Sequence, residues 1–130
     1  MLVQLNQVIA VALASALGGV ARFMIREYAS KWFGLAFPYS TLIVNTIGCF
    51  TAGVLIVYWQ HSHIPSIYKT AVTVGFLGAF TTFSAFSVDT LALYQQQEWL
   101  KMTLNITTNL GFSLIAVFFG AWIGGRILAP

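Results

Sequence analysis

Long apolar stretches recur along this chain, and short polar links separate them. Four stretches have close to the roughly 20 residues that a helix needs to cross a bilayer, and they cover residues 5–26, 39–59, 68–94 and 102–127. The links between them leave no room for a further folded unit. The pattern therefore predicts an all-α membrane protein in which residues 1–130 form a single domain of four transmembrane helices.

The third stretch differs from the others because polar and helix-breaking residues interrupt it. Its segment GFLGAFTTFSAFSVD contains, within ten positions, Gly75, Gly78, Thr81, Thr82 and Ser84. Hydrocarbon offers no water to backbone groups, so non-helical backbone survives at membrane depth only where protein or a polar cavity satisfies it. A break leaves carbonyl groups at the end of one half-helix and N–H groups at the start of the next, as in discontinuous helices that bind ions. We therefore expect the third helix to be broken in the middle of the membrane.

Two aromatic residues follow the expected break. Phe83 and Phe86 are three positions apart and share one face of a helix. The edges of aromatic rings are electropositive, so such edges can contact an anion without carrying a formal charge. Phenylalanine at helical spacing in a membrane helix more often packs or faces lipid. The adjoining polar break favours a role in a pore.

The second and fourth stretches also carry polar side chains. Asn45 lies deep in the second stretch, with Thr41 one turn before it. Its amide is either a contact between helices, worth on the order of 1 kcal/mol, or a source of two donors for an anion. In the fourth stretch, Asn105, Asn109 and Ser113 follow at four-residue steps and form a polar track along one face. Asn105 is near the end of that stretch, whereas Ser113 is deep within it.

The polar side chains of the four stretches are mainly neutral. Together with Ser84 and several threonines, the asparagines and Ser113 supply hydrogen-bond donors without negative charge. Donors of this kind suit a small, strongly hydrated anion, because each one replaces some of the water that the anion gives up. The chain has neither a phosphate-binding loop nor a set of nucleophile, base and orienting acid, so we predict that it is not an enzyme.

Charged residues are scarce and lie mainly near the ends of the stretches. Hydrophobic residues make up 58% of the chain and charged residues 7%, with six basic residues against three acidic ones. The basic residues form no patch for nucleic acid; most suit positions at the membrane surface. Arg22, one turn inside the first stretch, either extends to the headgroups or lines an aqueous vestibule that concentrates anions. For Asp89, an acid within a span, we expect a structural salt bridge or a vestibule role.

The basic residues give only a weak orientation signal. Arg22, Arg26, Lys31 and Lys101 fall on one side of the membrane, and Lys69 and Arg126 fall on the other. The hypothesis is therefore that the chain inserts in both orientations and that oppositely oriented subunits pair. In an antiparallel pair, the two breaks meet near the midplane, where about four carbonyl oxygens could hold Na⁺.

The break segment, together with GGVAR at 18–22, NTIG at 45–48 and the four-span length, resembles the Fluc family of fluoride channels, also called CrcB. The resemblance covers essentially the whole chain, and TTFSxF is its most specific motif. It implies a dual-topology homodimer in the bacterial plasma (inner) membrane. Such a dimer has two pores and a central structural Na⁺, and it exports fluoride passively to relieve fluoride toxicity.

The resemblance also implies roles for particular residues. The backbone carbonyls of Gly78 and Thr81 correspond to the Na⁺ site, and Arg22 corresponds to the basic residue at the end of the first span. The pore residues correspond to Phe83, Phe86, Asn45, Thr41, Asn109 and Ser113, and Ser84 adds a hydroxyl within the break. This chain departs from the family at Ala85, where Thr is frequent, and at Asp89, where Glu is common.

Two other functions remain open from the residues. A proton-coupled exporter of the small multidrug resistance type also has four spans, but it needs a carboxylate in the first span, and none occurs between Leu5 and Arg22. A structural or regulatory membrane subunit would explain the small residues and the asparagines as packing contacts. It would leave the interruption of the third stretch unexplained.

Overall fold

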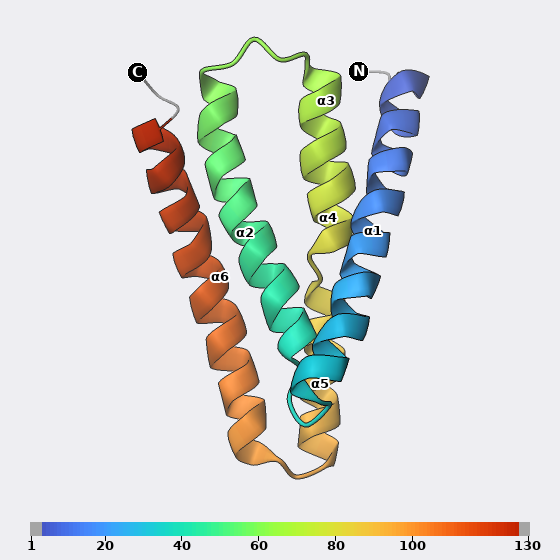
Figure 1. The fold of residues 1–130 in the computed structure, drawn as a ribbon, viewed down its shortest axis with the longest axis vertical. Coiled ribbons are helices and arrows are strands. Elements are labelled where there is room, and N and C mark those ends of the chain that lie inside the picture. Colours follow the sequence, from blue (N-terminus) through green and yellow to red (C-terminus); the bar gives the residue numbers. More distant parts are fainter. Residues whose placement is uncertain (1–3, 128–130) are drawn as a thin grey trace.

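The computed structural model describes residues 4–127, which form helices and no strand (Figure 1). Four helical stretches in this range are long and apolar enough to cross a membrane, with mean hydropathy between 1.6 and 2.0. The prediction of an all-α protein with four membrane-spanning stretches is therefore confirmed. The chain is a multi-pass membrane protein.

Three of the four stretches are single helices: α1 (Leu5–Phe33), α2 (Tyr39–Gln60) and α6 (Trp99–Ile127). The third stretch consists of α3 (Ser66–Thr70), the π-helix η1 (Ala71–Leu77), α4 (Gly78–Phe80) and α5 (Phe83–Gln95). Helices α1 and α6 are longer than the spans predicted at 5–26 and 102–127. The reason is that hydropathy marks only the apolar part of a helix, and both helices continue into polar sequence.

The helices end where the backbone adopts a conformation that stops them. Gly34 has a φ of 75° after α1, and its N–H donates to the Ser30 carbonyl at 3.0 Å. Gln97 has a φ of 59° in the loop after α5, where the Glu98 N–H donates to the Leu93 carbonyl at 3.0 Å. Both residues have a positive φ, which the backbone of a continuing helix does not adopt. Because the connections are short, consecutive membrane-crossing stretches run in opposite directions.

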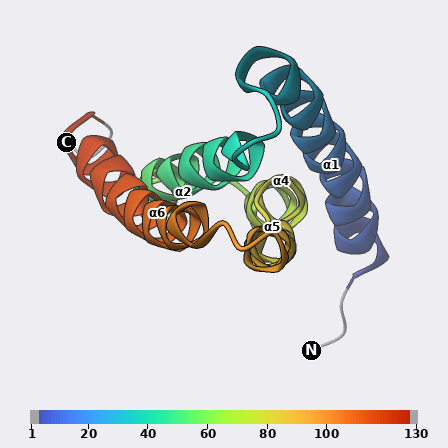
Figure 2. The same ribbon diagram turned by 90° about the horizontal axis from the view of Figure 1, so that it is seen from below.

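The third stretch lies between α1 on one side and the α2–α6 pair on the other, as both views show (Figures 1 and 2). Helix α2 packs mainly on α6, and α1 packs mainly on η1. The α2–α3 loop lies at the same end of the bundle as the start of α1 and the end of α6 (Figure 1). The α1–α2 and α5–α6 loops lie at the other end (Figure 1).

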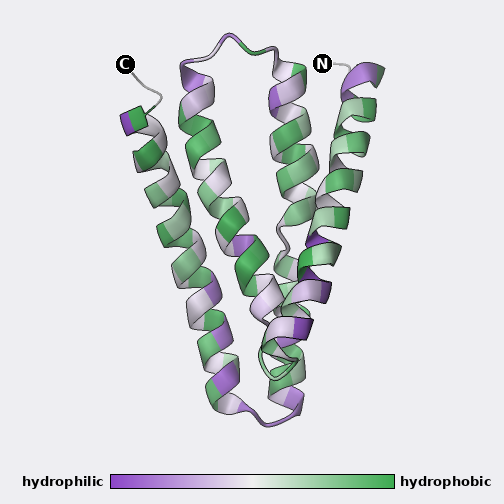
Figure 3. Cartoon of the chain, viewed as in Figure 1, coloured by the Kyte–Doolittle hydropathy of each residue, from purple (hydrophilic) through white to green (hydrophobic). Residues whose placement is uncertain are grey.

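Small residues allow these helix pairs to approach closely. A Cβ added to Gly18 would overlap the Phe76 carbonyl oxygen of η1. A Cβ added to Gly120 of α6 would likewise overlap the Phe50 carbonyl oxygen of α2. Close backbone contact of this kind drives helix association where lipid removes the hydrophobic effect between helices. Apolar residues predominate along all four stretches, and hydrophilic residues lie mainly toward the two ends of the bundle, with more of them near the α1–α2 and α5–α6 loops (Figure 3).

Candidate functional site

The site is built around two residues between α4 and α5. Thr81 and Thr82 have extended backbone, with ψ angles of 156° and 115°. Consecutive β-branched residues favour that conformation. Thr82 also begins the next helix: its Oγ1 accepts a hydrogen bond from the Ala85 N–H at 3.0 Å, as an N-cap threonine does. The TTFSA sequence therefore ends one helix and starts another within two residues.

The side chain of Asn45 from α2 contacts the backbone at this point. Asn45 Oδ1 accepts from the Thr82 N–H at 2.8 Å, and Asn45 Nδ2 donates to the Thr82 carbonyl at 3.1 Å. One amide thus satisfies both backbone groups of a buried residue, because Thr82 is only 7% exposed. Asn45, which the sequence predicted to line a pore, is therefore hydrogen-bonded through Thr82 to the backbone of the interruption that Thr81 and Thr82 form between α4 and α5.

The same contacts change the hydrogen bonding of two backbone carbonyls. In a continuous helix the Thr82 N–H would donate to the Gly78 carbonyl, but here it donates to Asn45. The Ala85 N–H would donate to the Thr81 carbonyl, but here it donates to Thr82 Oγ1. Gly78 is exposed on the surface of the chain, and Thr81 is half-buried. The two carbonyls assigned to a cation by resemblance therefore both belong to residues whose helical donors bond elsewhere.

The polar track of α6 continues from Asn45. Asn45 Nδ2 donates to Asn109 Oδ1 at 3.2 Å, and Asn109 Nδ2 donates to Asn105 Oδ1 at 2.9 Å. Asn105 Nδ2 then donates to Thr90 Oγ1 of α5 at 3.0 Å. Asn105 is 0% exposed and Asn109 is 4% exposed, so these amides bond inside the bundle, although Asn105 lies only about two turns from the start of α6. Ser113 is half-buried and lies one turn farther along α6, outside this set of bonds.

The two phenylalanines of the predicted site lie together but differ in exposure. Their ring centroids are 5.3 Å apart at an interplanar angle of 57°. Phe86 is 8% exposed, whereas Phe83 is 72% exposed and projects from the bundle. Ser84, also exposed, places its Oγ 3.2 Å from Thr82 Oγ1. One ring of the pair is thus fixed within this chain, and the other is available to a neighbouring surface.

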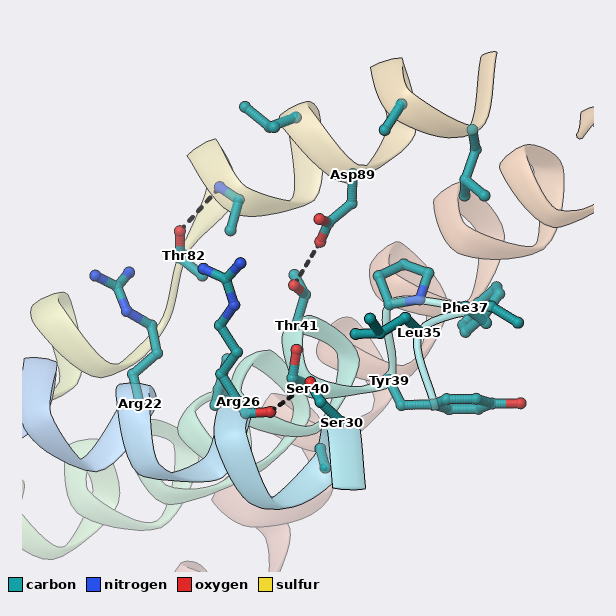
Figure 4. Close-up of a pocket in the computed structure, with 18 of the residues that line it drawn as sticks. Arg22, Arg26, Ser30, Leu35, Phe37, Tyr39, Ser40, Thr41, Thr82 and Asp89 are labelled. Carbon is teal, nitrogen blue, oxygen red and sulfur yellow. Dashed lines mark hydrogen bonds between the residues drawn. The ribbon is translucent and has the colours of Figure 1, made fainter. Parts of the chain in front are cut away.

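A cavity of about 580 Å³ opens beside the interruption, between α1, α2 and α5. Arg22 and Arg26 of α1 extend into it, toward the side where Thr82 and Asp89 lie (Figure 4). Asp89 Oδ2 accepts from Thr41 Oγ1 at 2.6 Å. The cavity therefore joins two guanidinium groups, one carboxylate and the polar backbone of the interruption.

The structure gives Asp89 a hydrogen-bond partner within this chain, Thr41. Among residues 4–127 the ion pair is Lys101 with Glu98, whose nitrogen and oxygen are 3.0 Å apart. Within these residues the Asp89 carboxylate forms no ion pair and bonds a hydroxyl instead. The expectation of a place in a polar vestibule agrees with its position in the cavity that Arg22 also lines.

Sequence reasoning placed Thr82 in the expected break but did not predict its contacts, and it missed Thr90 altogether. Thr82 is both an N-cap and the backbone partner of Asn45, and its signal was the helix-start pattern of a threonine before a new apolar face. Thr90 accepts from Asn105 and donates to the Phe86 carbonyl at 2.7 Å. No local pattern marks Thr90, because its partner comes from another helix.

Comparisons with known proteins place this chain among small membrane channels. Residues 9–121 match the model of the family described as CrcB-like protein, Camphor Resistance (CrcB). A fluoride-specific ion channel FluC of Shewanella baltica (strain OS155) is 43% identical over 116 residues, covering 89% of this chain and 94% of the relative. The fluoride-specific ion channel FluC of Shewanella oneidensis matches with the same identity and coverage.

Proposed function

Because this chain belongs to the CrcB-like family, we propose that it is an ion channel that conducts fluoride selectively and passively across a membrane. The observation that carries the proposal is the 43% identity to fluoride-specific ion channels over 89% of the chain. The family match over residues 9–121 includes every residue of the site. A channel has no covalent step to catalyse, in agreement with a site made of amides, hydroxyls and aromatic rings.

The anion would pass the polar residues beside the interruption. The guanidinium of Arg22 attracts anions into the cavity, since a charged cleft with low-dielectric walls raises the local concentration of the opposite charge. Ser84 and the Phe83–Phe86 pair adjoin the interruption and offer a hydroxyl and two ring edges. Thr41, Asn45, Asn109 and Ser113 are the neutral polar residues proposed along the path. Within the single chain, the donors of the first three bond other residues.

The proposed assembly is a homodimer of oppositely oriented subunits with two pores. One supporting observation is Phe83, which is 72% exposed next to a ring that is buried. Another is a groove between α2 and α6 that Phe50, Phe112 and Phe119 line. The groove includes Thr46, whose buried Oγ1 has no hydrogen-bond partner within residues 4–127. A second copy can cover the ring and the groove, and it can supply the missing partner.

A structural Na⁺ is proposed at the dimer axis. The carbonyls of Gly78 and Thr81 fit a hard monovalent cation, because both are neutral oxygens whose helical donors have turned to Asn45 and Thr82. Gly78 is exposed on the single chain, so a second subunit can approach this residue. In this position Na⁺ would compensate carbonyls that hydrocarbon leaves without donors. The interruption would then lie at the middle of the membrane.

The plasma (inner) membrane of a bacterium is the proposed location. A passive fluoride pathway there relieves fluoride toxicity, because HF that enters the cell dissociates and the trapped anion needs a route out. The four apolar helices meet the length that such a membrane requires.

The experiment that tests the function is fluoride efflux from liposomes that contain the purified protein. A fluoride electrode records release after a potassium ionophore removes the electrical block, and chloride-loaded liposomes are the control. We expect rapid release of fluoride and retention of chloride. Retention of both anions by folded, reconstituted protein would reject the channel. Release of fluoride only with a proton gradient would favour a coupled exporter instead.

A further inference from the structure

Five hydrogen bonds form a chain that begins and ends on the backbone of the third stretch. Every bond runs in the same direction from donor to acceptor. The Thr82 N–H donates to Asn45, Asn45 to Asn109, Asn109 to Asn105, Asn105 to Thr90, and Thr90 to the Phe86 carbonyl. The chain leaves the third stretch at the interruption, crosses α2 and α6, and returns to the first turn of α5.

The direction of this chain is fixed by backbone groups at several points. The Thr82 N–H can only donate, so Asn45 must turn its Oδ1 toward it and its Nδ2 toward Asn109. The backbone carbonyl of Asn105 can only accept, and Asn109 Nδ2 donates to it at 3.2 Å. The orientation of each amide therefore follows from chemistry, and reversing one amide would place like groups against each other.

Two residues in this series of hydrogen bonds, Asn105 and Thr90, lie beyond the residues that face the proposed fluoride path. Asn105 is fully buried, and Thr90 stands one turn after Phe86 on α5. The bond between them joins α6 to α5. The Thr90 hydroxyl is both the acceptor for Asn105 and the donor to the Phe86 carbonyl, so it completes the chain. In a medium of low dielectric, such chains reinforce each bond along them.

We propose that Thr90 and Asn105 are positioning residues of the fluoride pathway. They hold the amides of Asn109 and Asn45 in a single orientation. They also fix the rotation of α5, and with it the ring of Phe86, relative to α6. The inference rests on the proposed channel function for its effect on flux, whereas the chain of bonds itself can be tested without any ion.

The test uses substitutions of Thr90 in the full-length protein. Thr90→Val keeps the shape of the side chain but removes the hydroxyl, whereas Thr90→Ser keeps the hydroxyl but removes the methyl group. Thr108→Val is the matched control. The Thr108 hydroxyl donates to the backbone carbonyl four residues earlier at 2.6 Å, as the Thr90 hydroxyl does at 2.7 Å, but Thr108 takes no part in the five connected hydrogen bonds.

Two measurements are made on each variant. Fluoride efflux should fall about tenfold in Thr90→Val, because Asn105 Nδ2 loses its buried acceptor, and it should stay near the wild-type rate in Thr90→Ser and Thr108→Val. Side-chain amide signals of ¹⁵N-labelled asparagine, recorded by NMR, should shift for Asn109 and Asn45 in Thr90→Val alone. A merely local role of Thr90 would leave the Asn45 signal in place, since two other side chains separate them.

Two results would overturn the inference. One is wild-type efflux in Thr90→Val with unshifted amide signals. The other is equal loss of efflux in Thr90→Ser and Thr90→Val, which would assign the effect to methyl packing. If Thr90→Val does not fold, Thr90→Ala against Thr90→Ser makes the same comparison without steric risk. If the wild-type protein carries no fluoride, the channel function fails, and the amide signals still decide whether the chain of bonds couples Thr90 to Asn45.

Discussion

The side-chain amide of Asn45 pairs with both backbone groups of Thr82, accepting from its N–H at 2.8 Å and donating to its carbonyl at 3.1 Å. An interruption of a membrane helix removes backbone partners in a place without water. The amide replaces them, as a neighbouring β-strand would. Because Asn45 belongs to α2, the interruption is held by a contact between two membrane-crossing stretches, which links the local backbone to the packing of the bundle.

Replacing Asn45 by Leu should therefore destabilise the protein. The variant keeps a similar volume but leaves the Thr82 N–H and carbonyl unpaired, which costs about 1–3 kcal/mol for each buried group. We expect a lower melting temperature in detergent and a loss of fluoride efflux. Thr51→Val on the same helix is the control, since its hydroxyl bonds only the carbonyl of its own helix at Ile47. An Asn45→Leu protein with wild-type stability would contradict the structural role of the amide.

Gly18 and its neighbour Gly19 provide a matched pair for the packing of α1. A Cβ on Gly18 would overlap the Phe76 carbonyl oxygen, whereas a Cβ on Gly19 would meet nothing within 4 Å. Gly18→Ala should thus push α1 away from η1 and destabilise the protein by about 1–3 kcal/mol. Gly19→Ala should be neutral or slightly stabilising, because alanine favours a helix. Thermal unfolding of the two variants measures the difference, and equal melting temperatures would refute the close contact.

The number of membrane-crossing stretches and the family were predictable from the sequence. Hydropathy alone located the four stretches, because a bilayer imposes both a length and a composition on each of them. The resemblance carried by GFLGAFTTFSAFSVD is confirmed by the family match over residues 9–121. Helical spacing also placed Asn105 and Asn109 on one face, where the structure has them bonded to each other.

The partners of the polar side chains were not predictable from the sequence. Asn105 bonds Thr90, and Thr41 bonds Asp89, across 15 and 48 positions of the chain respectively. Such pairs depend on the rotation of each helix about its axis. That rotation is set by close contacts such as Gly18 with Phe76, which no single helix encodes. For the same reason the sequence left open a salt bridge or a vestibule role for Asp89, since its charge was visible in the sequence and its neighbour Thr41 was not.

Phe83 and Phe86 should respond differently to replacement by Ile. If the ring edges contact the anion, either variant should lower fluoride efflux about tenfold, by analogy with the 1–2 kcal/mol of other ion–ring contacts. Only Phe86→Ile should also lower stability in the monomeric fold, because Phe86 is 8% exposed and Phe83 is 72% exposed. Efflux and detergent unfolding are measured on the same preparations. Unchanged efflux in both variants would remove the rings from the pathway.

Removal of Na⁺ should destabilise the proposed dimer. A cation that binds only the assembled protein stabilises it by about 2.7 kcal/mol at 100 times its dissociation constant. Replacement of Na⁺ by N-methylglucamine should therefore lower the melting temperature and favour monomers. Thr81→Ser should keep the effect of Na⁺, because the proposed ligand is a backbone oxygen. Superimposable unfolding curves in the two salts would argue against a bound cation.

The proposed electrostatic role of Arg22 can be separated from a role in packing. Arg22 lines the cavity beside the interruption, whereas Arg126 near the other end of the chain lies over the ring of Trp122, 5.4 Å from its centroid. If Arg22 acts by concentrating anions, Arg22→Gln should lower fluoride efflux by roughly 3- to 10-fold at low ionic strength. The difference should shrink as an impermeant salt is added, since the screening length falls to about 10 Å at 0.1 M. Arg126→Gln should leave efflux unchanged at every salt concentration. A loss in Arg22→Gln that persists at high salt would instead assign Arg22 a direct contact with the ion or with the fold.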